Sequence, residues 1–118
     1  MSKKILYSCD TGVDDALALA YLAAQEECEV VGVTCSYGMS YVGDVFRNTK
    51  EVLRLCGKPE IPIVMGSETP LSGEHIDFSG GSKFHGMSGI GGVLPPSTPE
   101  DWGDAKPEDC LLYTSDAA

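Results

Sequence analysis

The chain has 118 residues, of which 42% are hydrophobic and 8% aromatic, and it carries a formal net charge of −10. This length allows at most one small domain or part of a larger one, and the composition is that of a globular chain. The acidity argues against a nucleic-acid backbone as partner, since that needs clustered Lys and Arg, and against an anionic membrane surface. A divalent cation or a small neutral substrate is compatible with it.

Signals for export, membrane insertion and disulfides are weak. No apolar run reaches the roughly 20 residues that span a bilayer, and the first acidic residue, Asp10, comes too early for a secretory signal. The five cysteines are odd in number and contain no C-x-x-C pair, so neither a zinc knuckle nor a disulfide framework is predicted. We expect reduced thiols in a cytoplasmic protein.

Two strand–helix units follow each other along the chain. The first pairs a strand over Lys4–Cys9 with a helix over Val13–Gln25, whose many apolar positions predict that it is largely buried. The second pairs a strand over Glu29–Ser36 with a helix over Gly43–Cys56, and a short third strand covers Pro62–Met65. This order predicts an α/β fold, a Rossmann-like and mostly parallel sheet with flanking helices.

The carboxyl ends of parallel strands meet at one edge of a sheet, and ligands of such sheets bind outside that edge. We therefore expect three segments to lie side by side there: Cys9–Thr11, Ser36–Met39 and Met65–Ser67.

Three carboxylates, Asp10, Asp14 and Asp15, crowd into six residues at this edge. Two carboxylates about 4 Å apart repel by roughly 4 kcal/mol at an effective dielectric constant near 20. A helix N-terminus stabilises one such charge by only ~0.3–1 kcal/mol. A bound hard cation is therefore the preferred explanation, and a structural helix cap or a carboxyl pair sharing one proton are the alternatives.

The second half of the chain is less regular. Residues Ser79–Pro99 are rich in Gly, Ser and Pro and include His85, which is typical of a binding loop, a lid or a disordered segment. The last residues, Pro107–Ala118, show no periodicity. We expect 1–106 to be the N-terminal part of a larger domain and 107–118 to be an atypical tail.

The segment Ser8–Ala16, Ser-Cys-Asp-Thr-Gly-Val-Asp-Asp-Ala, resembles the signature D-x-D-x-G-x-D-D-A of the inosine–uridine-preferring nucleoside hydrolases. Further segments resemble the same family in order and spacing over about residues 4–95. They are Val31–Thr34 with Tyr37-Gly38, Arg47-Asn48, Ile61–Gly66 with Pro70-Leu71, and His85-Gly86 with Gly89-Ile90.

The resemblance implies roles for the matching residues. Asp10 would bind Ca²⁺ and act as the general base on the attacking water, and Asp15 would be a second metal ligand. Asp14 would hold the ribose hydroxyls, and His85 would lie on a loop that closes over the substrate near the base. The remaining metal ligand and the acid that protonates the leaving base would lie in a part of the family's sequence that is not matched here.

Two further positions are candidates for substrate contact. Met39 stands where the family has an Asn, and a thioether can replace an amide only poorly, so a pocket wall is its simpler role. Asn48 lies in the middle of a predicted helix, where Asn is unfavourable, which favours a buried hydrogen bond near the site. The family's first Asp is Ser8 here, which removes a charge, and its usual Pro is Thr11.

The resemblance implies a nucleoside N-ribohydrolase, acting on a small-molecule nucleoside as a cytoplasmic homo-oligomer. Ser8 and Met39 favour one alternative, a relative that binds a cation or riboside without turnover. A truncated chain without independent function is another. A phosphatase of the haloacid dehalogenase type is disfavoured, because Asp10-Thr11-Gly12 lacks the D-x-D spacing.

Overall fold

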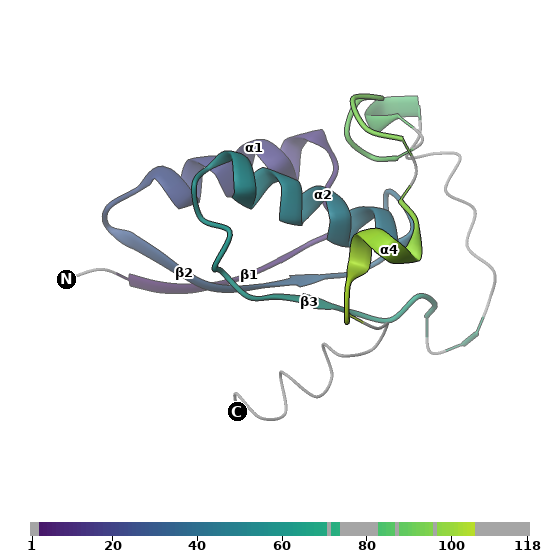
Figure 1. The fold of residues 1–118 in the computed structure, drawn as a ribbon, viewed down its shortest axis with the longest axis horizontal. Coiled ribbons are helices and arrows are strands. Elements are labelled where there is room, and N and C mark those ends of the chain that lie inside the picture. The colour runs from purple at the N-terminus through teal and green to yellow at the C-terminus, as the bar shows by residue number, and fades with distance from the viewer. Residues whose placement is uncertain (1–2, 71, 74–82, 87, 96, 106–118) are drawn as a thin grey trace.

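The computed structural model describes residues 3–70, 72–73, 83–86, 88–95 and 97–105. All five elements predicted from the sequence are present, with bounds that differ by at most one residue (Figure 1). A short helix near residue 100 was not predicted. In chain order the elements are β1 (Lys3–Cys9), α1 (Val13–Ala24), β2 (Cys28–Cys35), α2 (Val42–Leu55), β3 (Ile63–Met65) and α4 (Pro99–Trp102).

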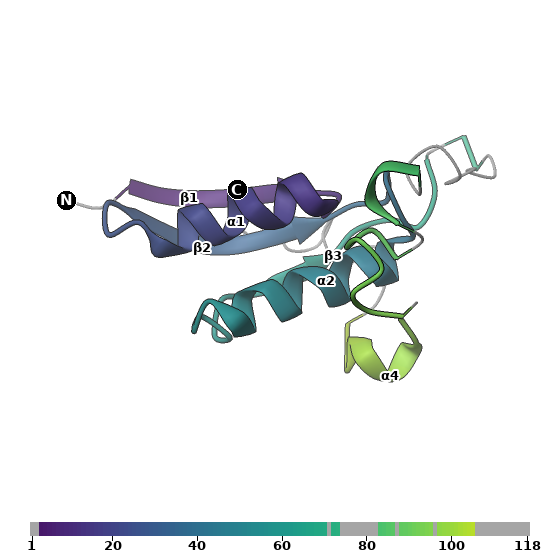
Figure 2. The same ribbon diagram turned by 90° about the horizontal axis from the view of Figure 1, so that it is seen from above.

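The three strands form one parallel sheet in the order β1-β2-β3, and the register aligns Cys9 with Cys35 and Cys35 with Met65. Helical connections between neighbouring parallel strands are almost always right-handed, and both connections in this sheet move from one strand to the next in the same direction across it. Such connections place their helices on the same face of the sheet. Figures 1 and 2 show α1 and α2 on the same face. The predicted α/β fold is confirmed. Within the described residues, β1 has a strand neighbour on one side only.

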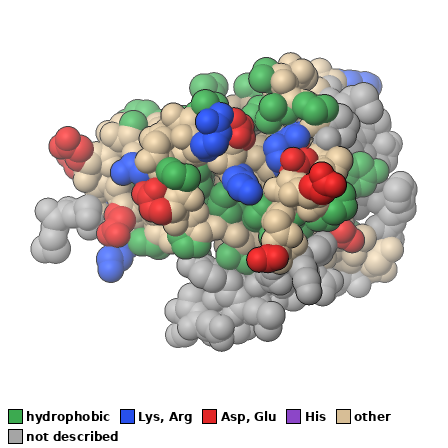
Figure 3. All heavy atoms as spheres, viewed as in Figure 1, with side chains coloured by type: hydrophobic (Ala, Val, Ile, Leu, Met, Phe, Trp, Pro, Cys, Tyr) green, Lys and Arg blue, Asp and Glu red, His purple; other side chains and the backbone are tan. Residues whose placement is uncertain are grey.

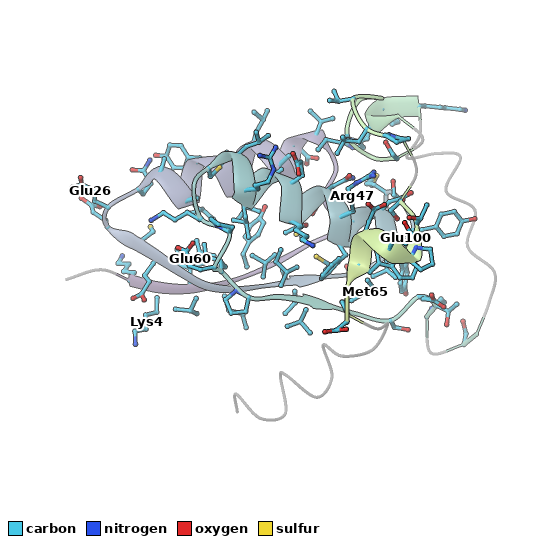
Figure 4. All side chains as sticks on the ribbon, in the orientation of Figure 1. Lys4, Glu26, Arg47, Glu60, Met65 and Glu100 are labelled. Carbon is cyan, nitrogen blue, oxygen red and sulfur yellow. The ribbon has the colours of Figure 1, made fainter. Side chains whose placement is uncertain are left out.

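The core lies between the sheet and the two long helices, and it consists of Cys9, Leu19, Val30, Val33, Cys35, Val45, Val52 and Leu53. A second cluster contains Val42, Phe46 and Met65, the last of which is labelled in Figure 4. Trp102 of α4 packs against this cluster and against Gly43, where a Cβ would collide with the indole ring. The packing of Trp102 therefore attaches α4 to the first turn of α2.

The prediction that the first helix is largely buried is wrong. Leu19 is the buried residue of α1, while Leu17 is 69% and Tyr21 is 66% exposed. Together with Val13, which is 38% exposed, these two side chains recur every four residues and form a stripe on the outer side of the helix. Apolar residues occupy two sides of α1, and the sheet covers one of them.

No disulfide joins the four cysteines within the described residues, Cys9, Cys28, Cys35 and Cys56. Among the same residues, no helix has the length and hydropathy needed to cross a bilayer. The predicted tail, 107–118, lies outside the described residues.

Candidate functional site

The carboxyl ends of the strands lie next to one another, as the sequence predicts. The Ser36 N–H donates to the carbonyl oxygen of Cys9 at 2.9 Å, and the Gly66 N–H donates to that of Cys35 at 2.7 Å. Each bond ties the residue after one strand to the last residue of its neighbour. The segments that follow β1, β2 and β3 therefore leave the sheet at the same edge.

Two of the three predicted carboxylates meet at this edge. Asp10 follows β1 and is half-buried, and Asp15 lies in the first turn of α1. Burial, a side-chain hydrogen bond with Asp10 and the negative charge of Asp10 together raise the pKa of Asp15 to about 6. Asp14 adds to that repulsion, but its own side chain is 78% exposed. Asp10 and Asp15 thus form a close carboxyl pair that would gain from a shared proton or a cation.

The turn after β2 packs directly against Asp10. A Cβ on Gly38 would lie 2.4 Å from Asp10 Oδ2 and 2.9 Å from its Cβ, so a larger residue would displace the carboxylate. The Gly38 N–H donates to the carbonyl oxygen of Ser40 at 3.3 Å, which closes the turn. Met39 lies half-buried within this turn. Gly38 therefore lets the second strand's turn approach the Asp10 carboxylate closely.

His85 lies at the N-terminus of α1, where it contacts Val13, a residue 72 positions earlier in the sequence. Its Nδ1 accepts a hydrogen bond from the Val13 N–H at 3.0 Å, and its Nε2 lies 3.8 Å from Asp14 Oδ1. The N-cap residue, Gly12, offers no side-chain cap, and a Cβ there would be 2.7 Å from His85 Nδ1. The imidazole thus takes the place of an N-cap side chain and holds its loop against the carboxylate segment.

Asn48 is fully buried on α2 and makes the buried hydrogen bonds that its position in a helix predicts. Its Nδ2 donates to the carbonyl oxygen of Ser88 at 2.6 Å, and its Oδ1 accepts from Arg47 Nε at 3.1 Å. Arg47 Nη2 also donates to the carbonyl oxygen of Pro95 at 2.6 Å. These two residues therefore fasten both ends of segment 88–95 to α2. Sequence reasoning did not identify Arg47 or Ser88 as partners of Asn48.

A buried hydroxyl and thiol network supports the site from below. Thr11 and Thr49, both fully buried, have hydroxyl oxygens 2.7 Å apart, and Thr49 donates to the carbonyl oxygen of Val45 at 2.8 Å. Cys9 Sγ lies 3.0 Å from the Thr11 hydroxyl, and Cys35 donates to Thr49 at 3.4 Å. Hydrogen bonding, above all with Cys35, outweighs burial and lowers the pKa of Cys9 to about 7. The network connects β1, β2 and α2 directly beneath Asp10.

The described residues contain no group of three or more His, Cys, Asp and Glu side chains placed to hold one metal ion. The structure brings Asp10 and Asp15 together, and it places His85 on the helix terminus rather than with them. A cation bound at this pair would complete its shell from water, from substrate oxygens or from further protein groups, since Ca²⁺ takes six to eight oxygen ligands.

The described residues also line cavities away from these carboxylates. One of about 460 Å³ is at the opposite end of the sheet, where Figure 4 labels Glu26 and Glu60 among its lining residues. Another, of about 370 Å³, lies between α2 and α4 and is lined by residues including Arg47 and Glu100. Figure 3 shows basic and acidic side chains intermingled on the face of the molecule that is seen in Figure 1, so this face does not carry a patch of one charge.

The fold is of the α/β class, and its close carboxylate pair lies at the carboxyl edge of the sheet, where ligands of such proteins commonly bind. The family model described as inosine-uridine preferring nucleoside hydrolase matches residues 5–116. A protein of Corynebacterium ammoniagenes encoded in the region 3′ of ribF is 33% identical over 90 residues, covering 76% of this chain and 95% of that protein. The chain belongs to the inosine-uridine preferring nucleoside hydrolase family.

Named relatives agree with this assignment. The pyrimidine-specific ribonucleoside hydrolase RihA of Klebsiella pneumoniae is 38% identical over 100 residues, covering 85% of this chain and 30% of that protein. The structure of a purine-preferring ribonucleoside hydrolase from Gardnerella vaginalis matches with a TM-score of 0.82 at 30% identity, covering 98% of this chain and 36% of that one. The chain spans about a third of the length of these two relatives.

Proposed function

We propose that this chain supplies the cation-binding and base-bearing part of a nucleoside N-ribohydrolase site. The observation that carries the proposal is the close pair formed by Asp10 and Asp15 at the carboxyl edge of the sheet, in a chain of this family. Two carboxylates in contact repel each other unless a proton or a cation lies between them. Their hard oxygen atoms suit Ca²⁺, which is the cation that we propose.

When bound, the cation would offset the carboxylate charges and acidify nearby water. Asp10, at the end of a rigid strand, would accept the proton of a water that attacks the anomeric carbon of the riboside. The bond from that carbon to the base nitrogen breaks as positive charge develops on the ribosyl ring. The base leaves with the electron pair of that bond and takes up a proton from water or from an acid outside the residues to which we assign roles. The solvent-exposed Asp14 would accept hydrogen bonds from the ribose hydroxyls, and Asp15 would hold the cation.

The remaining assignments have structural support of different kinds. His85 would position the loop over the substrate through its bond to the helix terminus, and Asn48 would hold that loop from below. Met39 would form a wall of the sugar pocket beside Asp10. From the sequence resemblance alone, we also propose that the full-length protein is a cytoplasmic homo-oligomer. Relatives are named for pyrimidine and for purine preference, so the proposal covers ribonucleosides as a class.

Calcium titration of the chain by calorimetry tests this proposal. We expect saturable binding by the wild type and at least tenfold weaker binding by Asp10→Asn, because the substitution removes one ligand charge while keeping the side-chain shape. The matched control is Asp104→Asn, which removes the same charge from an exposed position in the last described segment. Equal binding by wild type and Asp10→Asn, or no binding by a chain with a folded circular dichroism spectrum, would refute the proposal.

A relative that binds without turnover is the second candidate, because the turn that packs against Asp10 contains Met39 at the position where the resemblance to the family places an Asn. It predicts calcium-dependent riboside binding without release of ribose. A reducing-sugar assay on the same samples separates the two candidates.

A further inference from the structure

The side chain of Ser40 has a buried hydroxyl group that lacks a hydrogen-bond partner. The residue is 1% exposed, and within the described residues its Oγ is the buried side-chain polar atom that has no partner. Ser40 lies in the turn after β2, directly after Met39 and two residues before the start of α2. Buried hydroxyl groups almost always have a partner, so the exception requires an explanation.

Polar atoms from three segments surround the position that a Cβ on Gly89 would take, and the oxygen of this hydroxyl is one of them. A Cβ on Gly89 would lie 2.7 Å from Ser40 Oγ, 3.3 Å from the carbonyl oxygen of Thr11 and 3.4 Å from Asn48 Nδ2. Gly89 has a φ of +84°, and its lack of a side chain allows segment 88–95 to close over these atoms. Asn48 Nδ2 already donates to the carbonyl oxygen of Ser88. The Ser40 hydroxyl is thus covered by backbone that does not satisfy it.

The same turn connects this hydroxyl to the carboxylate pair. The carbonyl oxygen of Ser40 accepts from Gly38, which packs against the carboxylate of Asp10. Thr11, whose carbonyl oxygen faces Gly89, directly follows Asp10. Ser40 therefore lies beside the proposed site, between the Asp10 segment and the cover formed by segment 88–95.

We propose that Ser40 is a positioning residue for the sugar of the riboside. Its hydroxyl would hydrogen-bond a ribosyl hydroxyl once the turn at Gly89 shifts away from it, while the hydrogen bonds from α2 keep the two ends of segment 88–95 in place. Sugar hydroxyls both donate and accept, whereas the thioether of the neighbouring Met39 is only a weak acceptor. In this way Ser40 would supply the polar contact that Met39 cannot make. The inference rests on the proposed function, since it assigns one residue of that same site.

A first experiment needs no ligand and compares thermal unfolding of Ser40→Ala with that of Thr49→Val. Because the Ser40 hydroxyl has no partner in the ligand-free chain, we expect its removal to leave the unfolding midpoint unchanged or to raise it. Thr49→Val should lower the midpoint, because the Thr49 hydroxyl bonds Val45 and Thr11. An equal drop in both variants would show that Ser40 holds a structural partner such as a buried water, and would overturn the proposal.

A second experiment titrates ribonucleosides and their 2′-deoxy and 3′-deoxy analogues, in the presence of Ca²⁺, into wild type and Ser40→Ala. We expect the variant to bind ribonucleosides about tenfold more weakly, the size of one lost hydrogen bond. The analogue that lacks the contacted hydroxyl should bind both chains equally, because a site built for a hydroxyl discriminates only while its partner is present. Calcium affinity without nucleoside should be unchanged.

The outcomes separate this inference from the proposed function. If the wild type binds ribonucleosides and Ser40→Ala binds them equally well, the assignment of Ser40 is wrong and the proposed function stands. If the wild type binds neither calcium nor ribonucleoside, the proposed function fails and the Ser40 assignment fails with it. A variant that weakens every analogue by the same factor also contradicts the assignment, because a positioning hydroxyl must act through one sugar hydroxyl.

Discussion

The attachment of segment 88–95 to α2 gives the sharpest stability prediction, through Asn48→Ala. Alanine removes the donor to the carbonyl oxygen of Ser88, and Ser88 is only 2% exposed. An unsatisfied buried acceptor costs about 1–3 kcal/mol. A residual cavity of roughly 30 Å³ adds about 0.7 kcal/mol, and the better helix propensity of Ala returns about 0.5 kcal/mol. We therefore expect the free energy of unfolding to fall by about 2 kcal/mol.

Urea unfolding followed by circular dichroism measures this loss directly. The control is Lys50→Ala, which introduces the same residue at an exposed position of the same helix with a smaller gain in helix propensity, and it should stay within about 0.5 kcal/mol of wild type. Limited chymotrypsin digestion supplies a second readout, since the freed segment should be cut sooner near the exposed Phe84. Asn48→Ala with the same urea midpoint as Lys50→Ala would refute the reasoning.

Three further changes test other contacts. Gly43→Ala should destabilise the chain by about 1–3 kcal/mol and red-shift the emission of Trp102, the single tryptophan, because the new methyl group meets the indole ring. His85→Ala should lose about 1 kcal/mol that His85→Asn largely keeps, because Asn can still accept from Val13 N–H; equal losses in urea would contradict this. Asp15, with a pKa raised to about 6, favours the metal-free fold most below about pH 4, and this contribution is lost as the pH rises through 6. Calcium affinity should have the opposite pH dependence and should fall below about pH 6, because protons compete with the cation for Asp15. Calcium titrations at about pH 5 and 7.5 measure this difference, which should be smaller for Asp15→Asn.

The elements of this fold could be predicted from the sequence because each carries its own local pattern. The run Val30–Cys35 has the length and β-branched content of a buried strand, and the residues Ile5–Tyr7 before Asp10 form a short apolar run. The parallel order then follows from the alternation of strands and helices, and it fixes which loops meet at one edge. The juxtaposition of Asp10 with the turn at Gly38 was therefore predictable before any contact was known.

Contacts that depend on distant segments were not predictable in this way. Nothing in the local pattern around His85 indicates that it caps a helix that begins at Val13, because the two residues are brought together only by folding. The exposure of Leu17 likewise depends on which side of α1 the sheet covers. Among the described residues, the Ser40 hydroxyl lacks a partner because of how distant segments pack around it, and no local sequence pattern indicates this.

One element had a readable signal that was missed. Residues Thr98–Asp101, Thr-Pro-Glu-Asp, begin with a capping box and carry Pro at the first helical position, which together are typical of a helix start. The surrounding Gly and Pro residues favoured a loop over the whole of Ser79–Pro99, and they concealed the short helix α4.

The open side of β1 and the apolar stripe on α1 also determine how samples of this chain must be handled. In the part of the chain that the structure describes, the unpaired edge of β1 and the exposed Leu17 and Tyr21 are surfaces through which we expect copies of the chain to associate. The net charge of −10 opposes that association at neutral pH, but it vanishes near the isoelectric point of about 4.4. Turbidity should therefore peak near pH 4.4. Added salt should promote precipitation as acid does, because both weaken the electrostatic repulsion between the negatively charged molecules.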